Sequence, residues 1–463
     1  MKRAAIALAC LLPTSVLAAT PSCDVCVVGG GTAGVSAALQ AARAGAKTVL
    51  VEQGFQVGGN MTSGGVSWPG LFHAWGRQVI AGCGWDLVTN CVALAGGTLP
   101  DFGKDVGAEH WKHQVRISIP LWVALAEDAL TRAGVEIRYH ASPAAVAYGD
   151  GGAGRAALPW TVRLSAMGEE QVLRAAVLID ATGNGSLSAL AGAKRLRDPN
   201  VCQPGGYTYL FDPGVKSSAL DIPALEAART RAIASGELEP NDLCRGVKFF
   251  VDESNAILRD FIDGPDHGTT IANYVNGADN STAELRTKTN MRGRASMLRA
   301  YRFLKAQPGL GKLRVMWASP EVGVRETWRV EGDYVLTGDD YASGRVFDDS
   351  LCYAFYPIDM HDEKKGVRPR HLARGTVPTV PLRSLTVKDK RNLLVVGRCL
   401  SADRAANSAL RVQATCMATG QVAGEAAAFA AKRGCDVREL PLAELKARLV
   451  ASGAIVPSKE KVK

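Results

Sequence analysis

A short stretch decides the fold of this chain: Asp24-Val25-Cys26-Val27-Val28-Gly29-Gly30-Gly31-Thr32-Ala33-Gly34. Its apolar run predicts a buried strand, and the Ala-rich segment behind the glycines predicts a helix. Gly29 permits a tight turn, Gly31 lets the backbone approach a pyrophosphate, and Gly34 lets the helix pack closely on the sheet. Thr32 and Ala33 open the helix, whose unpaired N–H groups and partial positive charge favour phosphates.

A second β-type run, Thr48-Val49-Leu50-Val51, closes on Glu52. Glu52 follows Gly34 by 18 residues and stands at the end of the expected strand, where a carboxylate can accept both ribose hydroxyls of a dinucleotide. A Gly-rich turn without a ligand is the alternative. The strand before the turn, the helix after it and the acid in place favour dinucleotide binding instead.

The first residues have the pattern of a secretory signal peptide. Lys2-Arg3 precede an apolar run from Ala4 to Leu12, and Val16-Leu17-Ala18 offers small residues for cleavage. This run is far shorter than the ~20 residues of a membrane span. We therefore expect a signal peptide over residues 1–19, a periplasmic or secreted protein, and no transmembrane segment after cleavage. The alternative is a disordered or buried amino terminus.

The remaining composition is that of a folded protein. The chain has 463 residues, of which 47% are hydrophobic and 21% charged, and this length predicts two domains. Loss of Lys2 and Arg3 would lower the formal charge from +9 to +7, and an excess of this kind favours anionic ligands. Because no dense basic block with interleaved aromatics appears, we expect no nucleic-acid partner.

Ten of the eleven cysteines would remain after cleavage, since Cys10 lies in the signal. In an exported protein Cys23/Cys26 and Cys83/Cys91 are the local candidates for pairing. Position argues against the first pair, because Cys26 is expected mid-strand in the core. No second CxxC or histidine pair completes a tetrahedral set, so we expect no metal.

The pattern along the chain predicts the order of the elements. Helices are expected over 119–133, 224–235, 282–304 and 412–432, and strands over 135–139, 160–166, 170–174, 177–180 and 392–397, with a turn over 149–155. This order predicts an α/β fold: a Rossmann-like domain, with helices on both faces of a parallel sheet, and an inserted α+β cap. The expected bounds are 20–201 and 381–440 for the nucleotide domain, 202–380 for the cap and 441–463 for a tail.

Five segments together resemble the FAD-dependent oxidoreductase family related to the flavin subunit of heterodisulfide reductase, within the glutathione-reductase-like flavoproteins. They are Gly29–Gly34 with Glu52, Val57–Gly65, Asp180–Gly185, Gly323–Arg329 with Gly332 and Tyr334, and Asn392–Arg398 through Gly424. The resemblance implies FAD as cofactor, and a Gly58-Gly59 loop lying against it. It also implies that the Ala181–Gly183 turn, through Thr182 and Gly183, runs beside the adenosine-diphosphate portion.

The resemblance further implies that the last strand and helix place a helix amino terminus near the flavin pyrimidine oxygen. Such an end stabilises the electron density that builds at N1 and O2 on reduction. The residues expected to contact the cofactor there are Gly397, Arg398, Arg411 and Val412.

A nicotinamide dehydrogenase fits poorly, because it would not need these segments together. A two-nucleotide disulfide reductase also fits poorly. No second fingerprint is present, and no cysteine stands between Glu52 and Gly82.

Hydride removal from a carbon bearing a hydroxyl needs a base, usually histidine or a carboxylate. His361, in the family-like stretch Tyr356–Asp362, is our candidate, and a loop histidine bonded to Asp359 or Asp362 is the alternative. His73 follows the Gly64-Gly65 loop. It is expected to contact the isoalloxazine, act on substrate or carry flavin covalently, or more simply to shape the cofactor loop.

Arg325 and Arg329 stand four residues apart, in a segment expected to be a strand with both side chains on one side. Two guanidiniums could then fork onto an anionic or hydroxylated substrate. Ion pairs with Glu326, Glu331 or Asp333 are the alternative.

The leading hypothesis is an exported FAD-dependent enzyme that moves hydride from a small, hydroxylated organic substrate to flavin N5. Oxygen, a quinone or a haem protein would reoxidise the flavin. A flavin-dependent reductase of activated double bonds, with Arg325 as acid, is a second hypothesis. A non-catalytic or sensory flavoprotein is a third.

Overall fold

The structure of the protein is a computed structural model that describes residues 22–104, 106, 109–149, 158–198, 202–263, 271–362 and 366–458. The expected signal peptide and most of the expected turn at 149–155 lie outside these residues. Within the described part, no helix has the length and apolar character that crossing a membrane requires.

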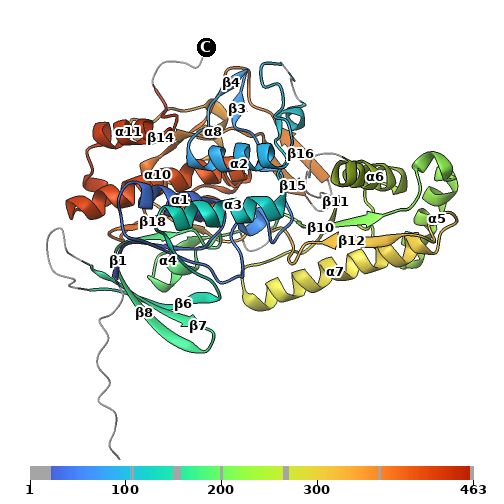
Figure 1. The fold of residues 1–463 in the computed structure, drawn as a ribbon, viewed down its shortest axis with the longest axis horizontal. Coiled ribbons are helices and arrows are strands. Elements are labelled where there is room, and N and C mark those ends of the chain that lie inside the picture. The colour runs from blue at the N-terminus through green and yellow to red at the C-terminus, as the bar shows by residue number, and fades with distance from the viewer. Residues whose placement is uncertain are drawn as a thin grey trace, which may run out of the picture.

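A seven-stranded sheet forms the centre of the larger lobe (Figure 1). The strand order is β5-β2-β1-β8-β7-β6, and β18 pairs with β8 as well. Strands β5, β2, β1, β8 and β18 are parallel to one another, whereas β7 pairs antiparallel with β8 and β6 pairs antiparallel with β7. The bounds are β1 Ser22–Val28, β2 Thr48–Val51, β5 Glu136–Arg138, β6 Ala141–Tyr148, β7 Trp160–Ala166, β8 Glu169–Asp180 and β18 Leu393–Val395.

The parallel part of the sheet confirms the predicted α/β fold. The chain leaves β1 toward β2 on one side and returns to β8 on the other, so the strand order reverses between β1 and β8. Ligands of open α/β sheets bind at the carboxyl ends of the strands at such a reversal. The Gly29 turn follows β1 and the Ala181 turn follows β8, so both predicted cofactor turns stand at this point.

One strand differs from the prediction. The expected strands at 170–174 and 177–180 form a single 12-residue strand, β8. Ala175 and Ala176 between them contain no turn-forming residue, so the backbone stays extended. Along one edge β8 changes partner, from β7 over its first half to β18 near its end.

Helix α10, Gln413–Arg433, is almost wholly buried and packs on α1, Thr32–Arg43. Glycine makes this contact very close. A Cβ added at Gly420 would lie 2.1 Å from the carbonyl oxygen of Ala33, and one added at Gly424 would lie 2.2 Å from that of Ala37. The expected helix at 412–432 and its close small-residue face are therefore confirmed.

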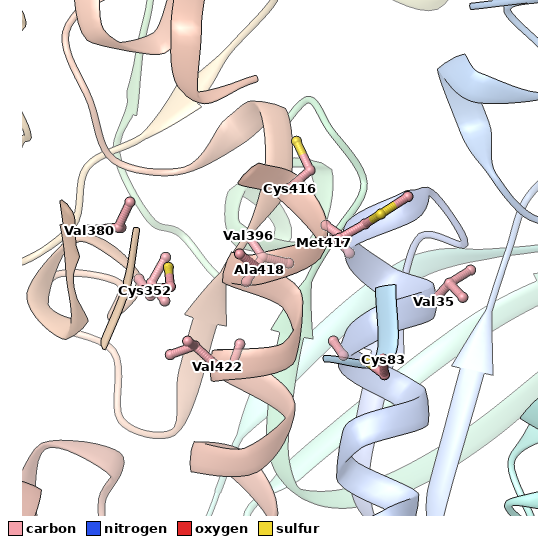
Figure 2. Packing of buried hydrophobic residues seen from close by; sticks show 14 of the residues in the cluster. Val35, Cys83, Cys352, Val380, Val396, Cys416, Met417, Ala418 and Val422 are labelled. Carbon is pink, nitrogen blue, oxygen red and sulfur yellow. The ribbon is translucent and has the colours of Figure 1, made fainter. Parts of the chain in front are cut away.

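Figure 2 shows α10 between two layers of apolar side chains. Val35 of α1 and Cys83 of α2 lie on one side of it, and Cys352 and Val380 lie on the other. Helices α2, Cys83–Leu94, α3, Ile119–Arg132, and α11, Leu442–Ala451, complete this core. Helix α10 is thus the central packing element of this core.

The smaller lobe has its own core, made of residues from Tyr207 to Val322. Its antiparallel sheet, in the order β11-β10-β12, is covered by three helices (Figure 1). The bounds are β10 Gly205–Asp212, β11 Ile271–Val275, β12 Arg314–Ala318, α5 Ile222–Ser235, α6 Val247–Asp263 and α7 Ala283–Lys305. Two of these helices, α5 and α7, were expected. The domain boundaries stay predictions, although residues 336–382 pack into the first core and not into this one.

The remaining strands and α-helices of the described residues are short. They are β3 His73–Ala74, β4 Arg77–Gln78, α4 Ser186–Leu190, β9 Arg195–Leu196, β13 Arg329–Val330, α8 Gly338–Ser343, β14 Ser350–Tyr353, β15 Ile358–Asp362, β16 Gly366–Arg370, β17 Thr379–Pro381 and α9 Arg404–Leu410.

The ten cysteines from Cys23 onward are free, so neither local pair is a disulfide in this structure. Cys26, Cys399 and Cys416 are buried, as expected for small apolar side chains. Burial raises the pKa of the Cys416 thiol to about 12, which keeps it protonated.

We expect Gly420→Ala to lower the free energy of unfolding by about 2 kcal/mol or more, because the added methyl must push α1 and α10 apart. Urea unfolding of the FAD-loaded protein measures this effect. Gly311→Ala is the matched control, since a Cβ at Gly311 meets no atom within 4 Å. Equal stability of the two variants would contradict the close helix contact.

Candidate active site

Neighbouring atoms crowd every glycine of the turn after β1 except Gly31. Gly29 has a φ of +105°, and a Cβ there would lie 2.4 Å from the carbonyl oxygen of Ala181. A Cβ at Gly34 would lie 1.8 Å from the carbonyl oxygen of Gly29, whereas one at Gly31 meets nothing within 4 Å. Only at Gly31, therefore, is there open space for a ligand to approach the backbone.

Helix α1 begins beside this space without a capping side chain. Gly31 is its N-cap, no side chain bonds the first turn, and Thr32 and Ala33 are buried. A buried helix start of this kind leaves N–H groups and a partial positive charge for an anion. The observed space and the uncapped helix end fit a pyrophosphate.

Glu52 lies next to the same turn. Its two carboxylate oxygens accept the backbone N–H groups of Gly30, at 2.5 Å, and Gly54, at 2.6 Å. Burial raises the pKa of this carboxyl, and the two N–H donors oppose the rise. The carboxylate is therefore fixed beside the open space at Gly31, in a position that fits a ribose.

The Gly58-Gly59 loop lies directly on the turn. Both glycines have positive φ, +103° and +54°, and the N–H of Gly58 donates to the carbonyl oxygen of Gly30 at 2.7 Å. A Cβ at Gly59 would stand 3.2 Å from the Cα of Gly31. The two glycine-rich segments thus form one continuous backbone surface.

The turn after β8 is held by a buried carboxylate. Asp180 accepts the N–H of Thr182 at 3.1 Å and its hydroxyl at 2.7 Å, and also binds Ser188. Gly183 follows with a φ of +73°. The Thr182 hydroxyl is engaged with Asp180, so this turn faces a ligand with its backbone.

Arg398 joins three segments of the chain. Its guanidinium donates to the carbonyl oxygens of Gly183, at 2.8 Å, and Val324, at 2.9 Å, and its own carbonyl accepts from Asn407. Burial without a carboxylate partner lowers its pKa to about 10. These hydrogen bonds fix the turn after β8, and the expected contact of Arg398 with the cofactor stays a prediction.

The amino end of α10 lies close to these loops. Val412 is its N-cap and has no capping side chain. A Cβ at Gly397 would lie 3.0 Å from the Cβ of Ala33, which places the turn after β18 on the start of α1. Gln413 keeps a buried side-chain oxygen without a partner. This unpaired acceptor and the uncapped helix start fit the polar edge of a bound flavin.

A polar cluster surrounds Arg411, the residue that precedes Val412. His361 Nε2 lies 2.9 Å from a carboxylate oxygen of Asp359, and the Arg411 guanidinium lies 3.4 Å from that same oxygen. The side-chain oxygen of Gln203 accepts a hydrogen bond from the backbone N–H of His361 at 3.2 Å. The cluster combines residues from β15, the start of the smaller lobe and the end of α9.

Electrostatics sets the protonation of this pair. Burial lowers the pKa of His361 to about 4 and outweighs the attraction of Asp359. Hydrogen bonding to His361 and the charge of Arg411 together hold the pKa of Asp359 at about 2, against its burial. At neutral pH the histidine is therefore neutral and the aspartate is charged.

Two buried nitrogens of the cluster, His361 Nδ1 and Arg411 Nε, have no protein partner. Buried polar atoms are almost always hydrogen-bonded, so such atoms mark a place for a ligand or water. Arg411 stands directly before Val412, the N-cap of α10, and His361 on β15 is linked to it through Asp359.

The two arginines of the 323–329 segment separate, contrary to expectation. Only Arg329–Val330 forms a strand, β13. Arg329 is buried against Glu326 and the carbonyl oxygen of Ala402, which is the ion-pair alternative. Arg325 instead donates to the carbonyl oxygen of Pro204 and lies over the Tyr274 ring, near the polar cluster.

His73 lies in a different place. It lines a cavity of about 390 Å³ together with three other histidines, and its ring stacks on Phe102 with centroids 3.7 Å apart. Burial, aided by the charge of His113, lowers its pKa to about 4. Among the described residues, no group of three or more His, Cys, Asp or Glu is arranged to hold a metal ion.

Sequence reasoning missed part of the cluster. The sequence analysis considered Asp359 only as a hydrogen-bond partner of a non-catalytic loop histidine. Asp359 and His361 are two residues apart on one strand, so their side chains lie on the same face, and this spacing could have indicated the pair. Gln203 and Tyr274 had no signal, because residues far apart in sequence reach the site only through the smaller lobe.

Comparison with known proteins adds the following. The sequence profile of the family described as FAD dependent oxidoreductase matches residues 24–449. A geranylgeranyl bacteriochlorophyll reductase-like protein from Thermoplasma acidophilum is 15% identical, with 89% of this chain and 79% of that chain covered and a TM-score of 0.41. A p-nitrophenol 4-monooxygenase from Pseudomonas putida is 12% identical, with 89% of this chain and 80% of that chain covered and a TM-score of 0.36. An aklavinone-11 hydroxylase, solved with FAD and aklavinone, is 19% identical, with 42% of this chain and 39% of that chain covered and a TM-score of 0.29. No curated protein matches the sequence.

We expect Glu52→Gln to weaken FAD binding at least tenfold, because an amide cannot offer the ribose two anionic acceptors and must compete for the N–H of Gly30. Titration of the FAD-free protein with FAD, followed by flavin fluorescence, measures the dissociation constant. Glu136→Gln, at an exposed position on β5, is the control and leaves FAD binding unchanged. Parent-like affinity of Glu52→Gln would exclude the carboxylate from the ribose site.

The lowered pKa of His73 predicts that the folded protein loses stability in acid. In the folded chain the pKa of His73 is lowered from 6.5 to about 4, so between these values the unfolded chain binds more protons. Stability is therefore fully present above pH 6.5 and falls as the pH drops toward 4. We expect His73→Phe, which keeps a ring on Phe102, to reduce this loss by about 1 to 3 kcal/mol.

Urea unfolding at pH 7 and at pH 4.5, with FAD saturating, measures the difference. His140→Asn is the control, because His140 is exposed and its positive φ suits asparagine. Parallel acid loss in His73→Phe and its parent would rule out the burial of a neutral His73.

Proposed function

The chain belongs to the FAD-dependent oxidoreductase family, and we propose that it is an exported dehydrogenase or oxidase acting on a small hydroxylated organic substrate. It is an enzyme with FAD as cofactor. Bound FAD supplies the two-electron acceptor, taking hydride at N5. The observation that carries the proposal is the neutral His361 with its unpartnered Nδ1, held by Asp359 at the amino end of α10.

His361 is suited to act as the general base. With a proton on Nε2 directed at Asp359, its Nδ1 presents a lone pair. Its pKa of about 4 keeps it unprotonated at neutral pH, and the charge of Asp359 stabilises the imidazolium that forms when it accepts a proton. The same residues therefore orient the ring and lower the cost of taking the substrate hydroxyl proton.

Arg411 and Arg325 give the cluster its binding charge. Arg411 carries a buried Nε without a partner, and Arg325 lies close enough to lower the pKa of His361. Such donors favour a substrate with oxygen acceptors beside the reacting hydroxyl. This charge supports a polar, oxygen-rich substrate over a hydrocarbon.

Other parts of the proposal rest on the sequence. The signal-like residues 1–19 support export to the periplasm or beyond. Oxygen, a quinone or a haem protein is proposed as the oxidant, since nicotinamide is scarce outside the cytoplasm. The motifs at 323–334 and 392–424 support the finer relation to the flavin subunit of heterodisulfide reductase.

A flavin-dependent reductase of activated double bonds is the second candidate. One observation favours it: burial and Arg411 lower the pKa of Arg325 to about 10, which makes this guanidinium a stronger acid than usual. A sensory role without catalysis is disfavoured by membership of an enzyme family.

We expect His361→Asn to lower kcat by 10² to 10⁴ while FAD content stays that of the parent, because only the base is lost. The assay is anaerobic bleaching of flavin absorbance by a panel of hydroxy acids, polyols and sugars. His140→Asn is the matched control, since His140 is exposed and far along the chain from the cluster.

Three outcomes separate the candidates. Bleaching by a hydroxylated compound that is lost in His361→Asn supports the dehydrogenase. Bleaching only by reduced dyes, followed by reoxidation with an enoate, supports the reductase. Unchanged turnover in His361→Asn would remove His361 as the base.

A further inference from the structure

The histidine-lined cavity is separate from the polar cluster. It is bounded by residues on both sides of Tyr356, since Phe355 and Pro357 line it. Tyr356 stands between the two: its ring lies edge-on to that of the lining residue His110, with centroids 5.2 Å apart, its hydroxyl accepts from Gln114 at 3.0 Å, and its pKa responds to Asp359 and Arg411 of the cluster. The 355–357 segment is therefore the wall between the cavity and the cluster.

The charged side chains of this cavity share one sign. Four histidines, one lysine and one arginine line it, and no carboxylate is found among its described lining residues: His73, His110, His113, His371, Lys104 and Arg374. Lys104 and Arg374 are exposed, with Lys104 lying 3.7 Å from a carboxylate oxygen of Asp101, whereas His73 and His113 are half-buried. Cations at the rim with imidazoles inside favour a ligand rich in oxygen acceptors.

Two of the lining histidines carry ring nitrogens that the protein does not use. His73 Nδ1 and His113 Nε2 are buried atoms without a hydrogen-bond partner. Since buried polar nitrogens are nearly always paired, these two mark a missing polar contact. The Phe102 ring, parallel to that of His73 within 3°, fixes the imidazole plane against rotation.

The remaining lining is apolar and aromatic. Leu71, Trp75, Phe355 and Leu372 contribute to it, and the volume of about 390 Å³ is within the range of sites for small molecules. Flat aromatic side chains favour flat ligands by stacking. A planar ring thus suits the interior, and an anionic group suits the histidines and the cationic rim.

We propose that this cavity is a binding site for a planar aromatic anion, such as an aromatic carboxylate, distinct from the FAD cradle and from the His361 cluster. The ring lies among Trp75, Phe355 and Leu372. The carboxylate accepts from His73 or His113, within the field of Lys104 and Arg374. The site does not depend on the proposed catalytic role of His361.

The test is calorimetric titration of the FAD-loaded protein with 2-naphthoate at pH 7.5. Its neutral isostere 2-naphthamide and the non-planar anion cyclohexanecarboxylate are the comparators. We expect one naphthoate per chain, bound at least tenfold more tightly than either comparator. Equal affinity for naphthoate and naphthamide would overturn the anion site, and binding only to FAD-free protein would mean that naphthoate occupies the FAD cradle.

Variants locate the site. We expect His113→Leu to weaken naphthoate binding at least tenfold and Arg374→Gln, at an exposed position, to weaken it about threefold. Arg370→Gln is the control, since Arg370 is exposed and does not line the cavity. Parent-like binding in both cavity variants would overturn the proposal. Because His361→Asn is expected to keep naphthoate binding while losing turnover, failure of the base assignment and failure of this site are distinguishable.

Discussion

The contact between helices α1 and α10 is the constraint on which the rest depends. At Gly420 and Gly424 the backbone of α10 meets the carbonyl oxygens of Ala33 and Ala37 at distances that no Cβ would allow. This contact fixes residues from the last quarter of the chain on the first dinucleotide turn. It also aligns α10 so that its amino end, at Val412, lies beside the loops that follow β1 and β2. The cofactor cradle is thereby assembled from both ends of the polypeptide.

The same constraint explains how the smaller lobe reaches the active site. Its chain leaves the sheet at the carboxyl end of β8, and on its way back the segment at Val324 passes the turn that follows β18. Arg398 holds these connections by its hydrogen bonds to Gly183 and Val324. Gln203 and Arg325 enter the cluster from the two connections, and Arg411 enters it from the segment before α10. The residues of the polar cluster therefore meet only when the two ends of the chain are joined.

How far the sequence could predict this arrangement depends on the range of each interaction. The glycine turn, Glu52 and helix α10 are local patterns with a fixed period or spacing, so the fold class and FAD as cofactor could be predicted from them, whereas the residues that contact FAD stay predictions. The sequence pattern predicted two strands over 170–180 where the structure has one, because a change of strand partner along a continuous strand leaves no local pattern in the sequence. The separation of Arg325 from Arg329 depends on Pro204, Glu326 and Ala402, and only Glu326 is near in sequence. Contacts of this kind are set by the tertiary structure.

Burial lowers the pKa of both histidines and arginines here, but it changes the charge at neutral pH only of the histidines. It lowers the pKa of His361 and His73 to about 4, which makes both imidazoles neutral and able to accept a proton or a hydrogen bond at physiological pH. It also lowers the pKa of Arg325 and Arg398 to about 10, yet both stay charged. Neutral bases therefore stand within a fixed positive field, and that field opposes the protonation of His361. Asp359 counters this field, because its single negative charge lies beside both the ring of His361, which we propose as the base, and the guanidinium of Arg411. A substrate anion would add negative charge on the other side of the ring, so binding itself would raise the basicity of His361 at the moment when a base is needed.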